Sequence, residues 1–131
     1  MEKIFISLPM ANRTQEAITT SFAIVKKICD IMFMNEEHEY IDSYIDDVQN
    51  EWTNTECANG KSVYYLSKSI EKLSQANVLV TISYPDMYRG CSTEMHIFQD
   101  YELGEIIKLP IQYICPDLVQ KEDTTMKLEL K

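Results

Sequence analysis

Hydrophobic positions along the chain fall into two patterns, short continuous runs and stripes spaced three or four residues apart. The continuous runs are rich in β-branched and aromatic residues and predict strands at 3–7, 39–44, 78–82 and 105–109. The run at 78–82 (Val-Leu-Val-Thr-Ile) is typical of a strand buried on both faces. A further run at 111–115 predicts a fifth strand or an extension of the fourth.

The spaced stripes predict helices between these strands. The first stripe runs to about residue 33, and Asn12 or Thr14 supplies the N-cap. Its apolar positions are Ile18, Phe22, Val25, Cys29 and Met32. Two more helices are predicted at 62–75 and 91–103, and Gly104 ends the second of them.

Strands that alternate with helices imply an α/β fold with a doubly wound, mainly parallel sheet. We therefore expect a flavodoxin- or Rossmann-like sheet with strand order 2-1-3-4-5. Residues 1–116 form the domain, and the polar residues 117–131 form a tail or a peripheral segment. Ligands of such sheets bind at the carboxyl ends of the strands, so the loops at 8–13, 45–61 and 83–91 should share one rim.

Composition narrows the class of partner. Among 131 residues, 21 acidic and 12 basic side chains give a net charge of −9. A polymer of nucleic acid needs a basic face, so we expect none to bind. No run approaches the roughly 20 apolar residues of a membrane span, which excludes a membrane partner.

The spacing of the cysteines indicates the cellular compartment of the protein. Four cysteines lie far apart, without a C-x-x-C pair, and there are only two histidines. Pro9 interrupts the first apolar run too early for a secretion signal. Together these features predict reduced thiols in the cytoplasm, with no metal site and no cofactor.

Glu94 is the most informative candidate for chemistry. It follows Gly90, which allows a ligand to approach the backbone closely, in the first turn of the predicted helix. The N–H groups of Cys91, Ser92 and Thr93 could face an anion there. A carboxylate at this place could attack a sugar carbon, as in glycosidases. The alternative is that the helix dipole alone favours an acidic residue in a first turn.

Other rim residues could recognise a ligand. Arg13 and Arg89 are the only arginines, lie in two different rim loops and could hold a phosphate, or could be ordinary surface residues. Asp86 could move a proton near a leaving base, although Pro-Asp also suits a turn. Four aromatic side chains could stack on a base or cap the sheet. They are Tyr44, Trp52, Tyr84 and Tyr88.

Several segments resemble nucleoside 2-deoxyribosyltransferases and their small bacterial and phage relatives. The resemblance covers roughly residues 3–109. It is carried by Ile-Ser-Leu-Pro-Met at 6–10 with Asn-Arg-Thr at 12–14, by Tyr-Ile-Asp-Ser-Tyr at 40–44, by Tyr-Tyr-Leu-Ser-Lys-Ser-Ile at 64–70 with Leu-Ser-Gln-Ala-Asn at 73–77, and by Arg-Gly-Cys-Ser-Thr-Glu at 89–94.

The resemblance implies a glutamate nucleophile that attacks the anomeric carbon of a nucleoside. Gly90 and Glu94 match the family spacing of a glycine, three residues and the glutamate, and Asp86 is the candidate that acts on the base. Related deoxynucleotide hydrolases bind the 5′-phosphate on the first loop and on the turn before the glutamate. The ligand-binding residues implied here, or offered by the rim loops, are Ser7, Leu8, Pro9, Met10, Asn12, Arg13, Tyr44, Tyr84, Arg89, Gly90 and Cys91.

Two classes of function stay open. One is an enzyme that breaks or exchanges the N-glycosidic bond of a nucleoside 5′-phosphate or related nucleotide through Glu94. The other is a protein that binds such a nucleotide without turning it over. Family members complete their sites across subunits, so we also expect a homodimer or a larger homo-oligomer.

Overall fold

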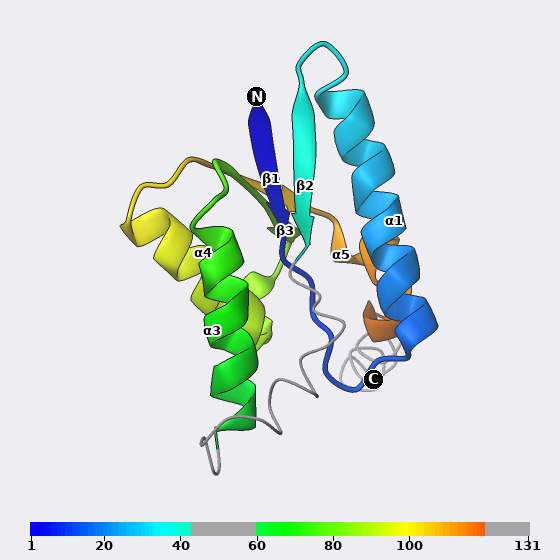
Figure 1. Cartoon of the computed structure of the whole chain (residues 1–131). Helices are drawn as coiled ribbons and strands as arrows, with labels where there is room; N and C mark the ends of the chain where they lie inside the picture. Colours follow the sequence, from blue (N-terminus) through cyan, green and yellow to red (C-terminus); the bar gives the residue numbers. More distant parts are fainter. Residues whose placement is uncertain (43–59, 120–131) are drawn as a thin grey trace.

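The computed structural model describes residues 1–42 and 60–119 and contains one parallel four-stranded sheet in this part of the chain. The strands are β1 (Glu2–Ile6), β2 (His38–Asp42), β3 (Val78–Ile82) and β4 (Glu105–Leu109). Their order is β2-β1-β3-β4, and all three pairings are parallel (Figure 1). The α/β class and the 2-1-3-4 order are confirmed.

Helices cover both faces of the sheet. Helix α1 (Gln15–Met32) lies with the short α5 (Ile111–Ile114) on one face, and α3 (Lys61–Leu73) lies with α4 (Arg89–Asp100) on the other (Figure 1). A 3-10 turn, η1 (Pro85–Met87), leads from β3 into α4. The predicted cap of the first helix is present, because the Thr14 hydroxyl accepts a hydrogen bond from Ala17 N at 3.0 Å.

The predicted fifth strand is wrong, because residues 111–114 form α5. Pro110 precedes this segment and lacks the N–H that a strand would use. Ile111, Ile114 and Cys115 are buried together. Their spacing of three and four residues fits a helical turn as well as a strand, which is why a short apolar run is ambiguous.

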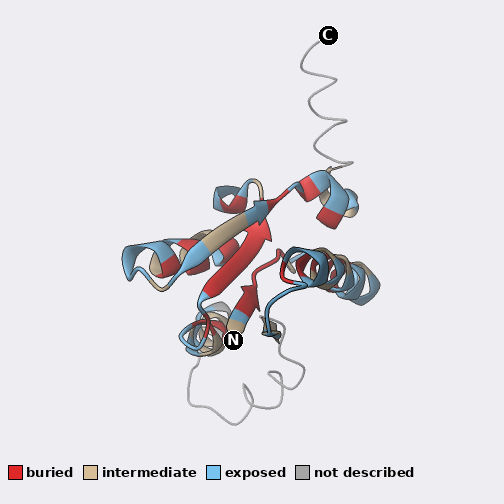
Figure 2. Cartoon of the chain, turned by 90° about the horizontal axis from the view of Figure 1, so that it is seen from above, coloured by how far each residue is buried: buried red, intermediate tan, exposed pale blue. Residues whose placement is uncertain are grey.

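The two central strands are buried between the helices (Figure 2), and their alternating side chains fill two cores. Ile4, Ile6 and the even-numbered residues of β3 pack towards α1 and α5. Phe5 and Leu79 pack towards α3 and α4. Because strand side chains alternate, Ser7 and Thr81 continue the second row and point to the α4 side at the carboxyl edge.

The opposite edge of the sheet is tied together by Asn77. Its side-chain oxygen accepts from Lys3 N at 2.7 Å, and its backbone oxygen accepts from Glu105 N at 3.2 Å. A Cβ atom on Gly104 would lie 1.9 Å from that same oxygen. The glycine that ends the predicted third helix is therefore required for β4 to begin beside β3.

The described part of the chain includes residues 117–119 of the predicted tail or peripheral segment. Residues 116–119 are helical, and Leu118 and Val119 pack against the core on the α1 side. Residues 120–131 and most of the predicted loop at 45–61 lie outside the described residues. Within residues 1–42 and 60–119, no helix has the length and apolar character needed to cross a bilayer.

Candidate functional site

The carboxyl group of Glu94 is enclosed at the carboxyl edge of the sheet. Ser7, which follows β1, donates to its Oε1 at 3.1 Å, and Ser69 of α3 donates to its Oε2 at 2.8 Å. All three residues are buried, and Glu94 is only 5% exposed. Three separate elements thus meet at one carboxylate.

Glu94 faces inward because of its position along α4. The helix begins at Arg89 and has no acidic residue in its first turn, so Glu94 lies in the second turn. The buried residues of the helix are Cys91, Glu94, Met95 and Phe98. The predicted first-turn position is wrong because the helix begins two residues earlier than expected, and the preference of acidic residues for helix N-termini does not explain this glutamate.

Burial sets the electrostatics of the site. It raises the pKa of Glu94 to about 7, while the hydrogen bonds from Ser69 and Ser7 act in the opposite direction. Burial likewise raises the pKa of the Cys91 thiol to about 12, so that thiol stays neutral. Among the described residues, the buried Thr81 hydroxyl on the same side of the sheet has no hydrogen-bond partner. The site is a buried polar cluster with one titratable carboxyl.

The first turn of α4 offers backbone donors at its exposed start, five residues or fewer before Glu94. The cap residue Tyr88 gives no side-chain hydrogen bond, and Ser92 N donates to Tyr88 O at 2.8 Å. The N–H groups that precede the first helical bond therefore belong to Arg89, Gly90 and Cys91, not to Ser92 and Thr93 as predicted. Arg89 and Gly90 are exposed, and a Cβ on Gly90 would meet nothing within 4 Å.

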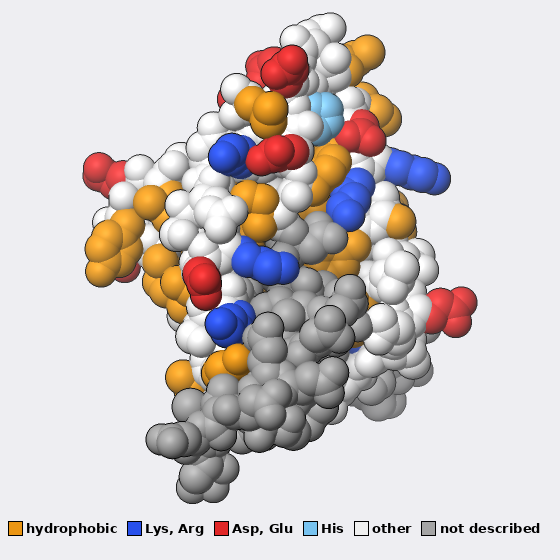
Figure 3. Space-filling view, in the orientation of Figure 1, with side chains coloured by type: hydrophobic (Ala, Val, Ile, Leu, Met, Phe, Trp, Pro, Cys, Tyr) orange, Lys and Arg blue, Asp and Glu red, His pale blue; other side chains and the backbone are white. Residues whose placement is uncertain are grey.

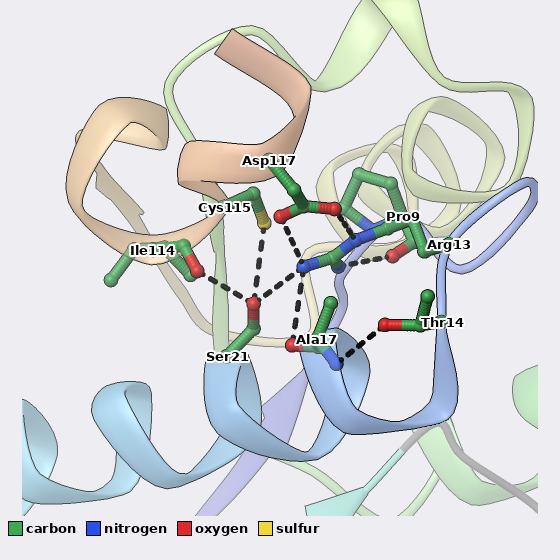
Figure 4. A network of polar contacts seen from close by, with 8 residues as sticks. All are labelled: Pro9, Arg13, Thr14, Ala17, Ser21, Ile114, Cys115 and Asp117. Carbon is green, nitrogen blue, oxygen red and sulfur yellow. Dashed lines mark hydrogen bonds and ion pairs between the residues drawn. The ribbon is translucent and has the colours of Figure 1, made fainter. Parts of the chain in front are cut away.

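Arg13 lies in the predicted rim loop, but its guanidinium is used inside the protein (Figure 4). It pairs with both carboxylate oxygens of Asp117 at 2.9 and 3.0 Å, and its side chain is completely shielded from solvent. It also donates to Pro9 O, Ala17 O and the Ser21 hydroxyl. The structure corrects the expectation that Arg13 offers its donors to a phosphate.

Asp86 does not face Glu94. It accepts a hydrogen bond from Ser92 at 3.1 Å, and His96 Nε2 lies 3.8 Å from it. Ser92 and His96 share the exposed face of α4, whereas Glu94 is two residues from each and points inward. The predicted pairing of Asp86 with Glu94 at one ligand is therefore absent from this structure.

The remaining predicted ligand residues divide between core and surface. Leu8 and Pro9 are buried, and Met10 packs against the α1-side core. Asn12 is exposed with a positive φ of 61°, and Tyr84 is exposed as well. Among the described residues, the exposed rim side chains thus include Asn12 and Tyr84, whereas Leu8 and Pro9 are buried.

Tyr44 lies outside the described residues. Ser69 was not predicted at all, although the sequence contains a signal for it. It lies between Leu66 and Leu73 in the apolar stripe of the predicted second helix, where a hydroxyl needs a buried partner.

A shallow apolar groove of about 220 Å³ lies between α3 and α4, towards the carboxyl ends of the two helices. Hydrophobic side chains gather at the left edge of the face shown in Figure 3, where the end of α4 lies. The groove is lined by Ile70, Leu73, Ser74, Ile97, Tyr101 and Leu103. Its lining is mostly apolar, and in the described ranges no cluster of three His, Cys, Asp or Glu side chains is placed to hold a metal.

Fold and site together define an α/β protein with a doubly wound parallel sheet and a buried carboxyl at its carboxyl edge. Comparison of the chain with protein-family models, curated proteins and solved structures gave no match. The resemblance to the deoxyribosyltransferases therefore rests on the sequence segments quoted above.

Proposed function

We propose that the protein binds a nucleoside 5′-phosphate or a related nucleotide at the carboxyl edge of its sheet and cleaves or exchanges the N-glycosidic bond through Glu94. One observation carries the proposal. Glu94 is the buried acidic side chain of the described core, and two serines from β1 and α3 hold it where ligands of parallel sheets bind. Burying a carboxylate costs free energy of desolvation, and acidic groups buried in this way are typical of functional sites.

The reaction has two displacement steps. A carboxylate oxygen of Glu94 forms a bond to the anomeric carbon, while the bond from that carbon to the base breaks. The electron pair leaves with the base, which takes up a proton from solvent. Water or a second base then attacks the same carbon, releases the Glu94 carboxylate and gives up a proton to solvent. Asp86 has no part in this scheme, because its carboxylate bonds to Ser92 on the exposed face of α4.

The first turn of α4 supports the phosphate part of the proposal. Arg89 is exposed at the first residue of this helix, and the backbone at Gly90 is open to approach. Helix N-termini attract anions through their N–H groups and the helix dipole. Arg89 precedes Glu94 by five residues, or about 7.5 Å along the axis and about 140° around it. A ligand that contacts both must therefore reach from the exposed start of the helix to the buried carboxyl.

A second candidate function is nucleotide binding without turnover. It is favoured by the burial of Glu94 and by its pKa of about 7, which leaves much of the carboxyl protonated at neutral pH. A protonated carboxyl can donate a hydrogen bond to a sugar or a base but cannot attack. Within residues 1–42 and 60–119, no second acid acts on the pKa of Glu94, which favours the same interpretation.

The test is to incubate the pure protein with a panel of nucleosides and 5′-monophosphates and to follow the free base by chromatography. We expect release of base by the parent and a loss of at least about 1,000-fold in turnover for Glu94→Gln. Glu71→Gln is the matched control, because Glu71 is a largely exposed glutamate on α3. Cleavage by Glu94→Gln at the parent rate would refute the proposal. Calorimetric binding of a nucleotide without base release would instead establish the second candidate.

A further inference from the structure

The two oxygens of the Glu94 carboxyl each receive one hydroxyl. Ser7 donates to Oε1 and Ser69 donates to Oε2, and Ser69 is the closer of the two at 2.8 Å. Ser7 comes from the end of β1, and Ser69 comes from the middle of α3. The carboxyl is therefore fixed from two directions.

The hydroxyl of Ser69 behaves unlike those of its neighbours. Serines in helices commonly donate back to a carbonyl three or four residues earlier. Ser67 does so to Tyr64 O at 2.7 Å, and Ser74 does so to Glu71 O at 2.6 Å. Ser69 is 7% exposed and instead donates across the helix interface to α4. This contact, rather than local helix geometry, explains a hydroxyl at a buried position.

We propose that Ser69 is a positioning residue, which fixes Oε2 of Glu94 and favours the charged form of the carboxyl in its buried site. The inference rests on the proposed function in so far as the charged form is the attacking one. A hydroxyl that donates to each oxygen is matched to a carboxylate, which only accepts, whereas a protonated carboxyl also carries an O–H that needs an acceptor of its own.

Among the groups around Glu94, the two serine hydroxyls are the ones that stabilise its charged form. Ser7 and Ser69 reach it from β1 and α3, and the neutral Cys91 thiol is its neighbour on α4. Within residues 1–42 and 60–119, no basic side chain forms an ion pair with Glu94, and no charged group contributes to its pKa shift. Hydroxyl donors are thus the groups here that oppose the effect of burial.

The first experiment measures the titration of Glu94 directly. The carboxyl carbon is followed by ¹³C NMR against pH, and Glu94→Gln identifies its signal. We expect Ser69→Ala to raise the titration midpoint of Glu94 by about one pH unit. One unit corresponds to about 1.4 kcal/mol, which is close to the free energy of one hydrogen bond to a charged group. Ser67→Ala is the matched control, because it removes an exposed serine hydroxyl from the same helix.

Ser69→Ala removes volume as well as a hydroxyl, so a second pair of variants tests the hydroxyl at constant side-chain volume. Ser69→Thr and Ser69→Val have the same side-chain shape and differ in the hydroxyl, so this comparison also holds if the alanine variant fails to fold. We expect the threonine variant to titrate near the parent midpoint and the valine variant to titrate higher. Equal midpoints for the two, or an alanine variant that titrates as the parent does, would overturn the inference.

Activity separates this inference from the proposed function. We expect Ser69→Ala to lower kcat at pH 7 about tenfold with little change in KM, and to move the acidic limb of the pH–rate profile upward. A parent protein that releases no base from any nucleoside would refute the proposed function, and the shifted midpoint would still support the role of Ser69. A parent that cleaves, together with an unshifted midpoint in Ser69→Ala, would overturn the role of Ser69 alone.

Discussion

Glu94 gives the protein a stability that depends on pH in an unusual direction for a carboxylic acid. Its pKa is about 7 in the folded protein against an ordinary value of 4.5. Between these values the folded state binds more protons than the unfolded state, so stability falls as pH rises. The stabilising contribution is fully present below about pH 4.5 and is lost as pH passes through 7.

We therefore predict that Glu94→Gln is more stable than the parent at pH 8. The expected gain is about 3 kcal/mol, the free energy that corresponds to the pKa difference. Urea unfolding at a series of pH values measures it. The gain should nearly disappear at pH 4, where the parent carboxyl is neutral in both states. An advantage that does not change with pH would show that the carboxyl is not the cause.

At this scale the sequence predicted some residues of the site and missed others. The glycine–glutamate spacing was enough to select Glu94, because the spacing is local. Its partners Ser7 and Ser69 come from elements that meet only after folding, and Ser69 was overlooked within an apolar stripe. Arg13 was assigned to a ligand because nothing local reveals that Asp117, 104 residues away in sequence, already pairs with it.

The pair of Arg13 and Asp117 joins the loop after β1, the first turns of α1 and residues 116–119. The hydrogen bonds to Arg13 lower the pKa of Asp117. A lowered pKa contributes stability above the ordinary value near 4, and this contribution is lost as pH falls through the folded value. Asp117 keeps 37% of its side chain exposed, so solvent screens part of the attraction.

We predict that Asp117→Asn lowers the free energy of unfolding by about 1–2 kcal/mol at pH 7, the size of a lost hydrogen-bonded partner of a buried guanidinium. Urea denaturation is the suitable measurement, because guanidinium chloride would screen the pair. The difference from the parent should shrink below about pH 4. An unchanged midpoint at pH 7 would mean that residues 116–119 do not stabilise the loop.

At the scale of elements, phosphate binding by the first turn of α4 can be tested without a substitution of Glu94. A methyl group on Gly90 would meet no atom within 4 Å, and alanine favours helix more than glycine does by up to about 1 kcal/mol. We predict that Gly90→Ala folds at least as stably as the parent in thermal unfolding. We also predict that it binds nucleoside 5′-phosphates less tightly, with little change for bare nucleosides, because the methyl blocks the approach to the backbone. Calorimetry with equal losses for both ligand classes would contradict a phosphate at this turn.

Strands and long helices were predictable from the sequence because each has a strong pattern of its own. Strands β3 and β4 begin and end at the predicted residues. The errors occurred where the pattern is short or where tertiary contacts decide. Residues 111–114 became a helix after Pro110, and α4 began two residues earlier than predicted, which moved Glu94 out of the first turn.

For the whole molecule, the alternation of strands and helices was sufficient to predict the parallel sheet, since right-handed crossovers leave few arrangements. The carboxyl edge then follows from topology, which places the loops after β1 and β3 together. The net charge of −9 concerns the whole molecule as well. It repels phosphate at long range, so any attraction for a nucleotide has to come from local donors such as those of the α4 turn.

The exposed apolar side chains of the described part lie in more than one place. At the carboxyl rim, Tyr84, Met87 and Tyr113 are each more than half exposed. Ile31 and Met34 are exposed at the far end of α1. Apolar side chains that follow strands β3 and β4 border the proposed ligand site, and a second subunit placed there would both bury them and help to enclose a ligand.

We predict that the protein forms a homodimer through this rim. Sedimentation at micromolar concentration should show a species of about twice 15.3 kDa. Met87→Glu places a charge in the interface and should shift the equilibrium towards the monomer, because a buried unpaired charge strongly disfavours association. Ile31→Glu is the matched control at the far end of α1 and should leave the dimer intact. A parent protein that sediments only as a monomer would exclude the dimer, and dissociation by Ile31→Glu but not by Met87→Glu would move the interface away from the site.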